Sequence, residues 1–273
     1  MKAAILARRV VPLLLIGAAA LVINAPHTYA QRGGRGGDGQ AGPPPTAKAA
    51  APADLTGYWV SLVTDNWIFR VITPAKGDYR YLPINAEGRR VADTWDPAKD
   101  EASGNACKGY GPVGVMRMPG RVHITWENDN TLRLETDTGM QTRLFHFEGS
   151  QPPAQPSLQG YSVAQWELPG GARGRGRGGQ AAQPSTQSRP GSSLKVVTTK
   201  MTPGYLQKNG IPYSGNAVLT EYFTTVEDKG IRYLAITTML EDPQYLTQSF
   251  VRTSQFKKLP EATGWNPTAC SAR

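Results

Sequence analysis

Few residues in this chain could carry out acid–base or metal chemistry. The sequence holds three histidines, of which His123 and His146 lie beyond residue 30. Alternating apolar and polar residues predict strands over 121–127, 131–137 and 141–147, with the two histidines on the polar face of the first and third. Two strand spacings of about 4.8 Å would separate the two histidines. They share this face with Arg133 and Glu135, so we expect it to be the solvated exterior of the sheet. No H-E-x-x-H, G-x-S-x-G, phosphate-loop or calcium-loop pattern occurs, and the sequence predicts no metal and no cofactor.

One glycine-rich motif matches a nucleotide-binding pattern by letter only. Gly109-Tyr110-Gly111-Pro112-Val113-Gly114 reads G-x-G-x-x-G. That pattern binds a dinucleotide where a strand precedes it and a helix follows it, so that the pyrophosphate meets the helix N-terminus. Here no apolar strand precedes the motif, Pro112 interrupts it, and a predicted strand follows it. We expect its glycines in a turn-rich loop.

Five carboxylates leave a carbohydrate-active hydrolase open as an alternative. A glycosidase needs two carboxyl groups about 5–10 Å apart in an open cleft. The candidates are Glu127, Asp129, Glu221, Glu241 and Asp242. The sequence cannot pair them, and turn and cap roles are expected for each.

Aromatic residues offer a binding surface instead. The sequence has six Trp, eleven Tyr and six Phe, and they concentrate in the predicted strands. Side chains of this kind line the apolar cavities of ligand-holding barrels. The candidate ligand-binding residues are Trp59, Trp126, Phe145, Phe147 and Tyr222. The alternative is that these side chains simply fill the interior of the fold.

The sequence contains two cysteines, Cys107 and Cys270. In an oxidising compartment they would form one disulfide that ties the end of the chain to its first half. Two buried free thiols are the alternative. A metal site is disfavoured because no histidine or further cysteine has the spacing of a co-ligand.

Period-two alternation dominates the chain, and helical periodicity is nearly absent, which predicts an all-β fold. About ten strands are expected, and the short turns between most of them favour antiparallel pairing. The strands not yet named are expected over 57–63, 67–72, 161–167, 193–201, 217–225, 231–240 and 248–257. The expected architecture is a closed antiparallel barrel, with a β-sandwich as the alternative.

One or two short helices should interrupt the strands. Asp96 as N-cap, Pro97 at the first helical position and Gly104 just past the end predict one helix. Residues 86–95 are expected to form another. Both would lie on a loop between strands and cover one end of the fold.

The first predicted strand carries a resemblance. Gly57-Tyr58-Trp59 resembles the Gly-x-Trp start of lipocalin-type (calycin) barrels, and residues 220–223, 234–237 and 250–252 resemble their closing strands. The resemblance implies a lipocalin-like barrel in which a late basic residue covers the tryptophan. Lys257 and Lys258 are both candidates for that residue.

A second resemblance covers most of the predicted fold. The stretches D-L-T-G-Y-W at 54–59, G-Y-S-V-A-Q-W-E at 160–167, T-E-Y-F at 220–223 and E-D-P-Q-Y-L-T at 241–247 are similar to a family of exported bacterial proteins. This resemblance implies export and an all-β domain, and it implies no mechanism.

Residues 1–30 have the three parts of a signal peptide. A basic start is followed by an apolar run at 10–23 and by a small residue, Ala30, after which cleavage is expected. The run has about 14 residues where a membrane-spanning helix needs about 20, which disfavours an uncleaved anchor. We therefore expect a periplasmic or secreted protein; Arg8-Arg9 leaves the twin-arginine route open beside the general secretory one.

Two low-complexity segments divide the rest of the chain. Residues 31–53 and about 169–190 are rich in Gly, Pro, Ala and Arg and are expected to be disordered, the second as an insertion into a single β domain at 54–273. Ten of the 30 Lys and Arg residues lie in the leader and these segments, against one of the 21 acidic residues, so the domain is formally neutral. Without interleaved aromatics the Arg-Gly segment is not expected to bind nucleic acid, and an anionic envelope polymer is its possible partner.

Three hypotheses for function follow. The first is an exported, non-enzymatic barrel that binds a small apolar ligand or an envelope component. The second is the hydrolase with paired carboxylates. The third is a structural or adaptor domain that makes its contacts through the Arg-Gly segments.

Overall fold

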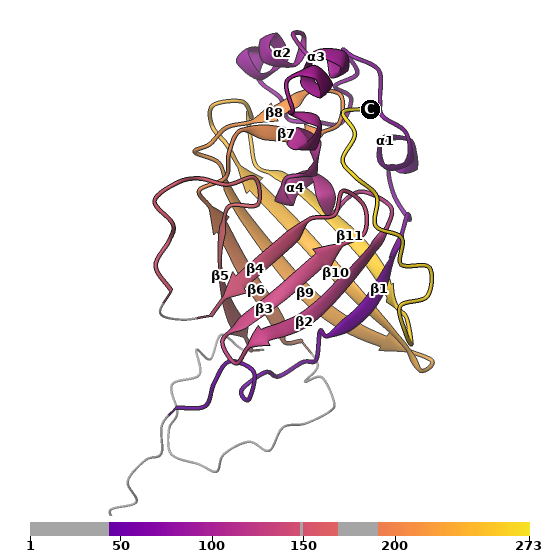
Figure 1. Ribbon diagram of the computed structural model, residues 1–273, viewed down its shortest axis with the longest axis vertical. Coiled ribbons are helices and arrows are strands. Elements are labelled where there is room, and N and C mark those ends of the chain that lie inside the picture. The colour runs from indigo at the N-terminus through magenta and orange to yellow at the C-terminus, as the bar shows by residue number, and fades with distance from the viewer. Residues whose placement is uncertain (1–43, 148–149, 169–190) are drawn as a thin grey trace, which may run out of the picture. The chain divides into compact units, whose positions relative to one another are not determined.

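The computed structural model describes residues 44–147, 150–168 and 191–273. The predicted signal peptide, residues 31–43 of the predicted linker and the predicted insertion at 169–190 lie outside them. The described residues form a β-barrel with short helices and a small hairpin at one end (Figure 1).

Nine strands close the barrel. In order around it they are β1 (Gly57–Leu62), β2 (Arg121–Asn128), β3 (Thr131–Thr136), β4 (Thr142–His146), β5 (Tyr161–Glu167), β6 (Ser193–Thr199), β9 (Val218–Asp228), β10 (Ile231–Glu241) and β11 (Phe250–Lys258). β11 pairs with β1, where Lys258 lies opposite Trp59, and β2 pairs with the other edge of β1. Because the pairing of β1 with both β2 and β11 closes the ring, no strand of the ring has a free edge. The predicted all-β barrel is therefore confirmed, and the alternative of a β-sandwich is wrong.

An odd number of strands dictates one parallel pair. Strand directions can alternate all the way around a ring only when the number of strands is even. The parallel pair here is β4 with β5, where Phe145 lies opposite Ser162 and His146 opposite Val163. A parallel connection must return the chain to the starting end, and the described part of that crossover is residue 147 and residues 150–160. The barrel is therefore mixed but mostly antiparallel.

The prediction of a strand over 67–72 is wrong. These residues form the helix α1 (Trp67–Val71) after Asn66, which adopts a left-handed conformation with φ 46°. Both edges of β1 are already paired, so the segment that follows β1 has no edge to join. Sequence alternation also missed the hairpin of β7 (Gly204–Gln207) and β8 (Ile211–Tyr213), whose strands are too short to show a period.

The remaining helices all lie between β1 and β2. They are α2 (Ala86–Ala92), α3 (Pro97–Ala102), the 3₁₀ helix η1 (Ala106–Tyr110) and α4 (Pro112–Val115). The predicted cap is confirmed, since the Asp96 carboxylate accepts hydrogen bonds from the backbone N–H groups of Ala98 and Lys99. Figure 1 shows these helices and the β7–β8 hairpin gathered over one end of the barrel, which we call the helical end. No described helix is long and apolar enough to cross a membrane.

The opposite end is closed partly by the start of the domain. Residues 44–53 belong to the predicted linker, yet their backbone binds the β2–β3 turn: Ala47 N–H donates to the Asn130 side chain at 2.9 Å, and Lys48 N–H to the Asp129 carbonyl at 3.0 Å. The indole N–H of Trp166 donates to the Ala47 carbonyl at 3.3 Å. Residues 44–53 are therefore held against the end of the barrel by these hydrogen bonds.

Candidate functional site

The five predicted ligand-binding residues lie in three different environments. Trp59 and Phe145 point into the barrel and are fully buried. Phe147 and Trp126 pack against each other with ring centroids 5.6 Å apart, beside Trp166, at the end opposite the helices. Tyr222 lies on the outer face, because its neighbours on β9, Glu221 and Phe223, both point inward. The strands bring four of the five to the barrel interior or its edge and leave Tyr222 outside.

Trp59 has the surroundings that the lipocalin-type resemblance implies. Its indole N–H donates to the Leu55 carbonyl at 2.9 Å. The Lys258 ammonium lies 4.6 Å from the centre of its ring and donates to the Thr56 carbonyl. Of the two candidate lysines, the structure therefore places Lys258 over the tryptophan, a cation–π arrangement.

The barrel interior around these residues is filled by side chains. Trp59 is 0 % exposed, and Leu132, Phe145, Leu194 and Phe223 are at most 1 % exposed. A side chain lining a space large enough for water would retain accessible surface, so a ligand at this level would have to displace packed side chains. A binding role for the five aromatic residues stays a prediction.

A buried ion pair occupies the interior nearer the helical end. Arg143 of β4 binds both carboxylate oxygens of Glu221 of β9, at 3.1 and 2.5 Å, and both side chains are 0 % exposed. Arg143 also donates to the Thr198 hydroxyl at 3.4 Å, and that hydroxyl lies 2.8 Å from the Ser162 hydroxyl. The pair is bidentate, the geometry in which a guanidinium and a carboxylate satisfy each other best.

The other candidate carboxylates have structural contacts or face solvent. Asp242 is buried and accepts hydrogen bonds from the backbone N–H of Ser214 at 2.7 Å and from its hydroxyl at 2.9 Å. Glu127 forms a surface ion pair with Arg133 at 3.1 Å, and Asp129 and Glu241 are exposed. Glu221 is the one member of the set inside the barrel, and its charge is already matched by Arg143.

The two histidines lie on the outer face of the sheet, as the alternation predicted. His123 stacks on Tyr58 with centroids 3.9 Å apart, and its Nδ1 lies 3.5 Å from Glu135. His146 stacks on Tyr161 at 5.2 Å, and burial lowers the pKa of its imidazole. Within the described residues, no group of three or more metal-ligating side chains gathers.

The G-x-G-x-x-G motif forms the end of η1 and the helix α4, where a turn-rich loop was expected. Close packing explains its glycines: a Cβ on Gly111 would overlap the Tyr213 hydroxyl, and one on Gly114 would overlap the Gly109 carbonyl. Among the described residues that hydroxyl has no hydrogen-bond partner, and burial raises the pKa of Tyr213 well above its usual range. The motif builds the packed floor of the helical end.

The predicted disulfide is confirmed. Cys107 of η1 and Cys270 are joined, with Cα atoms 5.1 Å apart. The bond holds residues 270–273 against η1, where the Tyr110 hydroxyl accepts a hydrogen bond from the Ser271 N–H at 3.2 Å. The disulfide thus fixes the end of the chain beside the helical end of the barrel.

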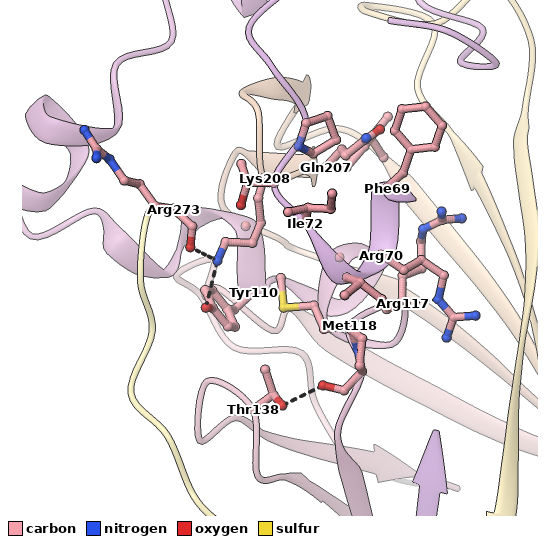
Figure 2. A pocket seen from close by; sticks show the side chains of 17 residues that line it. Phe69, Arg70, Ile72, Tyr110, Arg117, Met118, Thr138, Gln207, Lys208 and Arg273 are labelled. Atoms are coloured by element: carbon pink, nitrogen blue, oxygen red, sulfur yellow. Dashed lines mark hydrogen bonds between the residues drawn. The ribbon is translucent and has the colours of Figure 1, made fainter. Parts of the chain in front are cut away.

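A cavity of about 630 Å³ lies at this end, between α1 and the segments held by the disulfide. Its walls come from five separate parts of the chain. They are residues 69–74, the η1–α4 region with 117–119, Thr138, the end of β7 at 206–208, and Arg273. Figure 2 shows Lys208 and Tyr110 on one side and Phe69 with Arg70 on the other, with Ile72 and Met118 between them. We call this the α1 cavity; its volume is within the range of about 300–1,000 Å³ typical of small-molecule sites.

The apolar wall of the α1 cavity continues onto the surface. Trp67, Ile68, Val71 and Ile72 are exposed although all four are large and apolar. Four such residues within one short segment form an exposed apolar patch of the kind that marks binding sites. Arg70 anchors the segment from beneath, through an ion pair with Asp65 at 3.1 Å and a hydrogen bond to the Arg117 carbonyl at 2.8 Å.

Sequence reasoning missed the α1 cavity and the buried ion pair for different reasons. The cavity joins Phe69 and Arg273, which are more than 200 positions apart, and no spacing rule links such residues. The ion pair did leave a signal. Glu221 shares a face with the apolar Leu219 and Phe223, and Arg143 shares a face with Phe145, so each charge was visible on an apolar face.

No family model, curated protein or solved structure matches this chain. Its described residues form a closed nine-stranded β-barrel with a filled interior around Trp59 and a cavity at the helical end.

Proposed function

We propose that this protein is an exported, non-enzymatic binding protein that holds a small apolar ligand in the α1 cavity. The observation that carries the proposal is the exposed apolar segment around α1, continuous with the wall of a cavity of about 630 Å³. Exposed apolar groups of this size cost free energy in water unless a partner covers them. In ligand-holding barrels the ligand lies inside the barrel. Here side chains fill the interior around Trp59, so we expect the ligand in the α1 cavity at the helical end.

Export is the second part of the proposal. The leader at residues 1–30 supports it, and so does the Cys107–Cys270 disulfide, since such bonds persist in oxidising compartments. Kinship with lipocalin-type barrels and with the family of exported bacterial proteins is proposed on the Gly-x-Trp start and on Lys258 over Trp59. An envelope component is then the expected source of the ligand.

The test is binding of a neutral apolar probe, N-phenyl-1-naphthylamine, whose fluorescence rises in an apolar site. The purified mature protein should bind it in the micromolar range. Ile72→Asn should weaken binding about 5- to 10-fold, because a buried aliphatic contact is worth about 1–1.5 kcal/mol.

The matched control is Val226→Asn. Val226 is a β-branched residue on β9 that is 55 % exposed, against 57 % for Ile72, and it lies outside the α1 cavity. Ile72 itself has an extended backbone, so both changes carry a similar conformational cost. Absence of probe binding, or equal binding by the two variants, would contradict the proposal.

A further inference from the structure

The segment around α1 exposes its apolar residues and buries its charge. Its one charged residue, Arg70, is buried. Four large apolar residues of the segment are instead 41–61 % exposed, and they are Trp67, Ile68, Val71 and Ile72. A surface helix of a globular protein has the opposite arrangement, with its apolar residues toward the core. Trp67 and Val71 are one helical turn apart, as are Ile68 and Ile72, so the four side chains share one face.

The exposed apolar surface extends beyond α1 to two neighbouring segments. The exposed ring of Tyr81 packs edge-on against Phe69 of α1, with ring centroids 6.3 Å apart. The Tyr81 carbonyl accepts a hydrogen bond from the Arg252 guanidinium at 2.6 Å, and Val251 beside it is exposed as well. We call this surface the α1 patch; its members are Trp67, Ile68, Val71, Ile72, Tyr81 and Val251. Apolar residues from three segments that stay exposed together indicate an interaction surface.

The α1 patch is bordered by an excess of positive charge. Lys76 is exposed and lies four residues after Ile72. Among the described residues, neither Lys76 nor Arg252 forms an ion pair. The two carboxylates of this region, Asp65 and Asp78, are each paired with an arginine and so add no net negative charge.

Two openings flank the α1 patch, and neither brings an acidic residue to it. One is the α1 cavity, and the other is a groove lined by residues 81–83 and 248–252. No aspartate or glutamate is part of either lining. Exposed apolar side chains bordered by net positive charge are complementary to a membrane surface, whose interior is apolar and whose anionic lipids attract cations. Trp and Tyr also suit that boundary, because their rings are apolar and each has a polar atom that stays hydrated.

We propose that the α1 patch docks this protein on the surface of a membrane that contains anionic lipids. Val71 and Ile72 belong both to the patch and to the wall of the α1 cavity. Docking therefore brings the cavity against the bilayer, in which an apolar ligand dissolves. The inference goes beyond the proposed function, since it assigns a surface and a partner and holds whether or not the cavity is filled.

The experiment measures binding of the mature protein to vesicles by flotation. The vesicles contain phosphatidylcholine alone or equal parts of phosphatidylcholine and phosphatidylglycerol. The wild type should bind the mixed vesicles more tightly, because the anionic surface attracts the cations beside the patch. Trp67→Ser combined with Ile68→Ser should weaken binding to the mixed vesicles at least about tenfold, because two large apolar side chains no longer leave water. Every variant keeps the basic segments at 31–53 and 169–190, so those segments cannot cause a difference.

The matched control is Val163→Ser combined with Val226→Ser. These are two exposed apolar residues of β5 and β9 outside the patch, and the control should bind as the wild type does. Trp67→Phe keeps the patch apolar and should retain most of the binding. Trp67 is the one exposed tryptophan of the described residues, so Trp67→Phe should also lose most of the fluorescence quenching that bromine-labelled lipid causes in the wild type.

The outcomes separate this inference from the proposed function. Neither Trp67 nor Ile68 lines the α1 cavity, so the double serine variant should still bind N-phenyl-1-naphthylamine. Equal vesicle binding by that variant and the wild type would overturn the inference and leave the proposed function standing. A wild-type dimer that the variant converts to a monomer, without vesicle binding by either, would overturn it too. Vesicle binding by a wild type that does not bind N-phenyl-1-naphthylamine would instead contradict the proposed function alone.

Discussion

Replacing Glu221 with glutamine should destabilise this protein far more than the same change at Glu167. Arg143 and Glu221 are both 0 % exposed and share two hydrogen bonds. Glutamine keeps the shape but removes the negative charge, and its amide N–H₂ would face an Arg143 donor. Breaking one side of a buried ion pair costs about 3–5 kcal/mol, because the other charge stays buried without compensation.

The control pair is on the surface. Glu167 lies 3.7 Å from Lys195, and both side chains are partly exposed. Removing one partner of such a pair costs about 0–1 kcal/mol. For a domain of this size 1 kcal/mol corresponds to about 2–4 °C, so Glu221→Gln should lower Tm by about 6–20 °C and Glu167→Gln by at most about 4 °C.

A double variant separates the charge from the packing. Arg143→Met with Glu221→Met removes both charges and should cost less than either single change, since an apolar pair of similar volume needs no compensation. Thermal unfolding followed by circular dichroism measures all of these variants. Equal Tm values for Glu221→Gln and Glu167→Gln, or additive costs in the double variant, would refute the reasoning.

Three further outcomes are expected. Gly111→Ala should lower the free energy of unfolding in urea by about 1–3 kcal/mol, because the added methyl group would overlap the Tyr213 hydroxyl. Adding Tyr213→Phe should restore most of that loss, and a double variant as unstable as Gly111→Ala would contradict the packing argument. Replacing both Cys107 and Cys270 with serine should lower the free energy of unfolding by up to about 5 kcal/mol, since the bond closes a loop of 163 residues, and reactive thiols in the unfolded, unreduced wild type would contradict the bond. Because burial lowers the pKa of His146, the unfolded chain binds the proton better than the folded protein does, so stability should fall as the pH drops below about 6.5. His146→Gln should flatten that part of a urea-midpoint profile, and an unchanged profile would contradict it.

Local patterns predicted the barrel well where both faces of a strand carried a clear signal. In β2 the alternation of Val122 and Ile124 with Arg121 and His123 predicted which face is buried, and the structure buries Val122 and Ile124. The Asp96 cap and the cysteine pair were equally visible, because each depends on a few residues with one dominant physical role.

The features that could not be predicted depend on how the nine strands close into a ring. Whether residues 67–72 pair as a strand depends on the two edges of β1, which distant strands occupy. The parallel β4–β5 pair follows from the number of strands in the ring and not from any residue in either strand. The α1 cavity likewise exists only once the Cys107–Cys270 bond and the barrel bring Ile72, Lys208 and Arg273 together.

The most direct test of the account is to locate a bound apolar ligand by NMR. N-phenyl-1-naphthylamine titrated into ¹⁵N-labelled mature protein should shift the amide signals of residues 69–73, 117–118 and 206–208, which line the α1 cavity. Signals from Leu132, Phe145, Leu194 and Phe223 in the filled interior should stay where they are. Shifts confined to those interior residues would contradict the central claim and would return the ligand to the barrel.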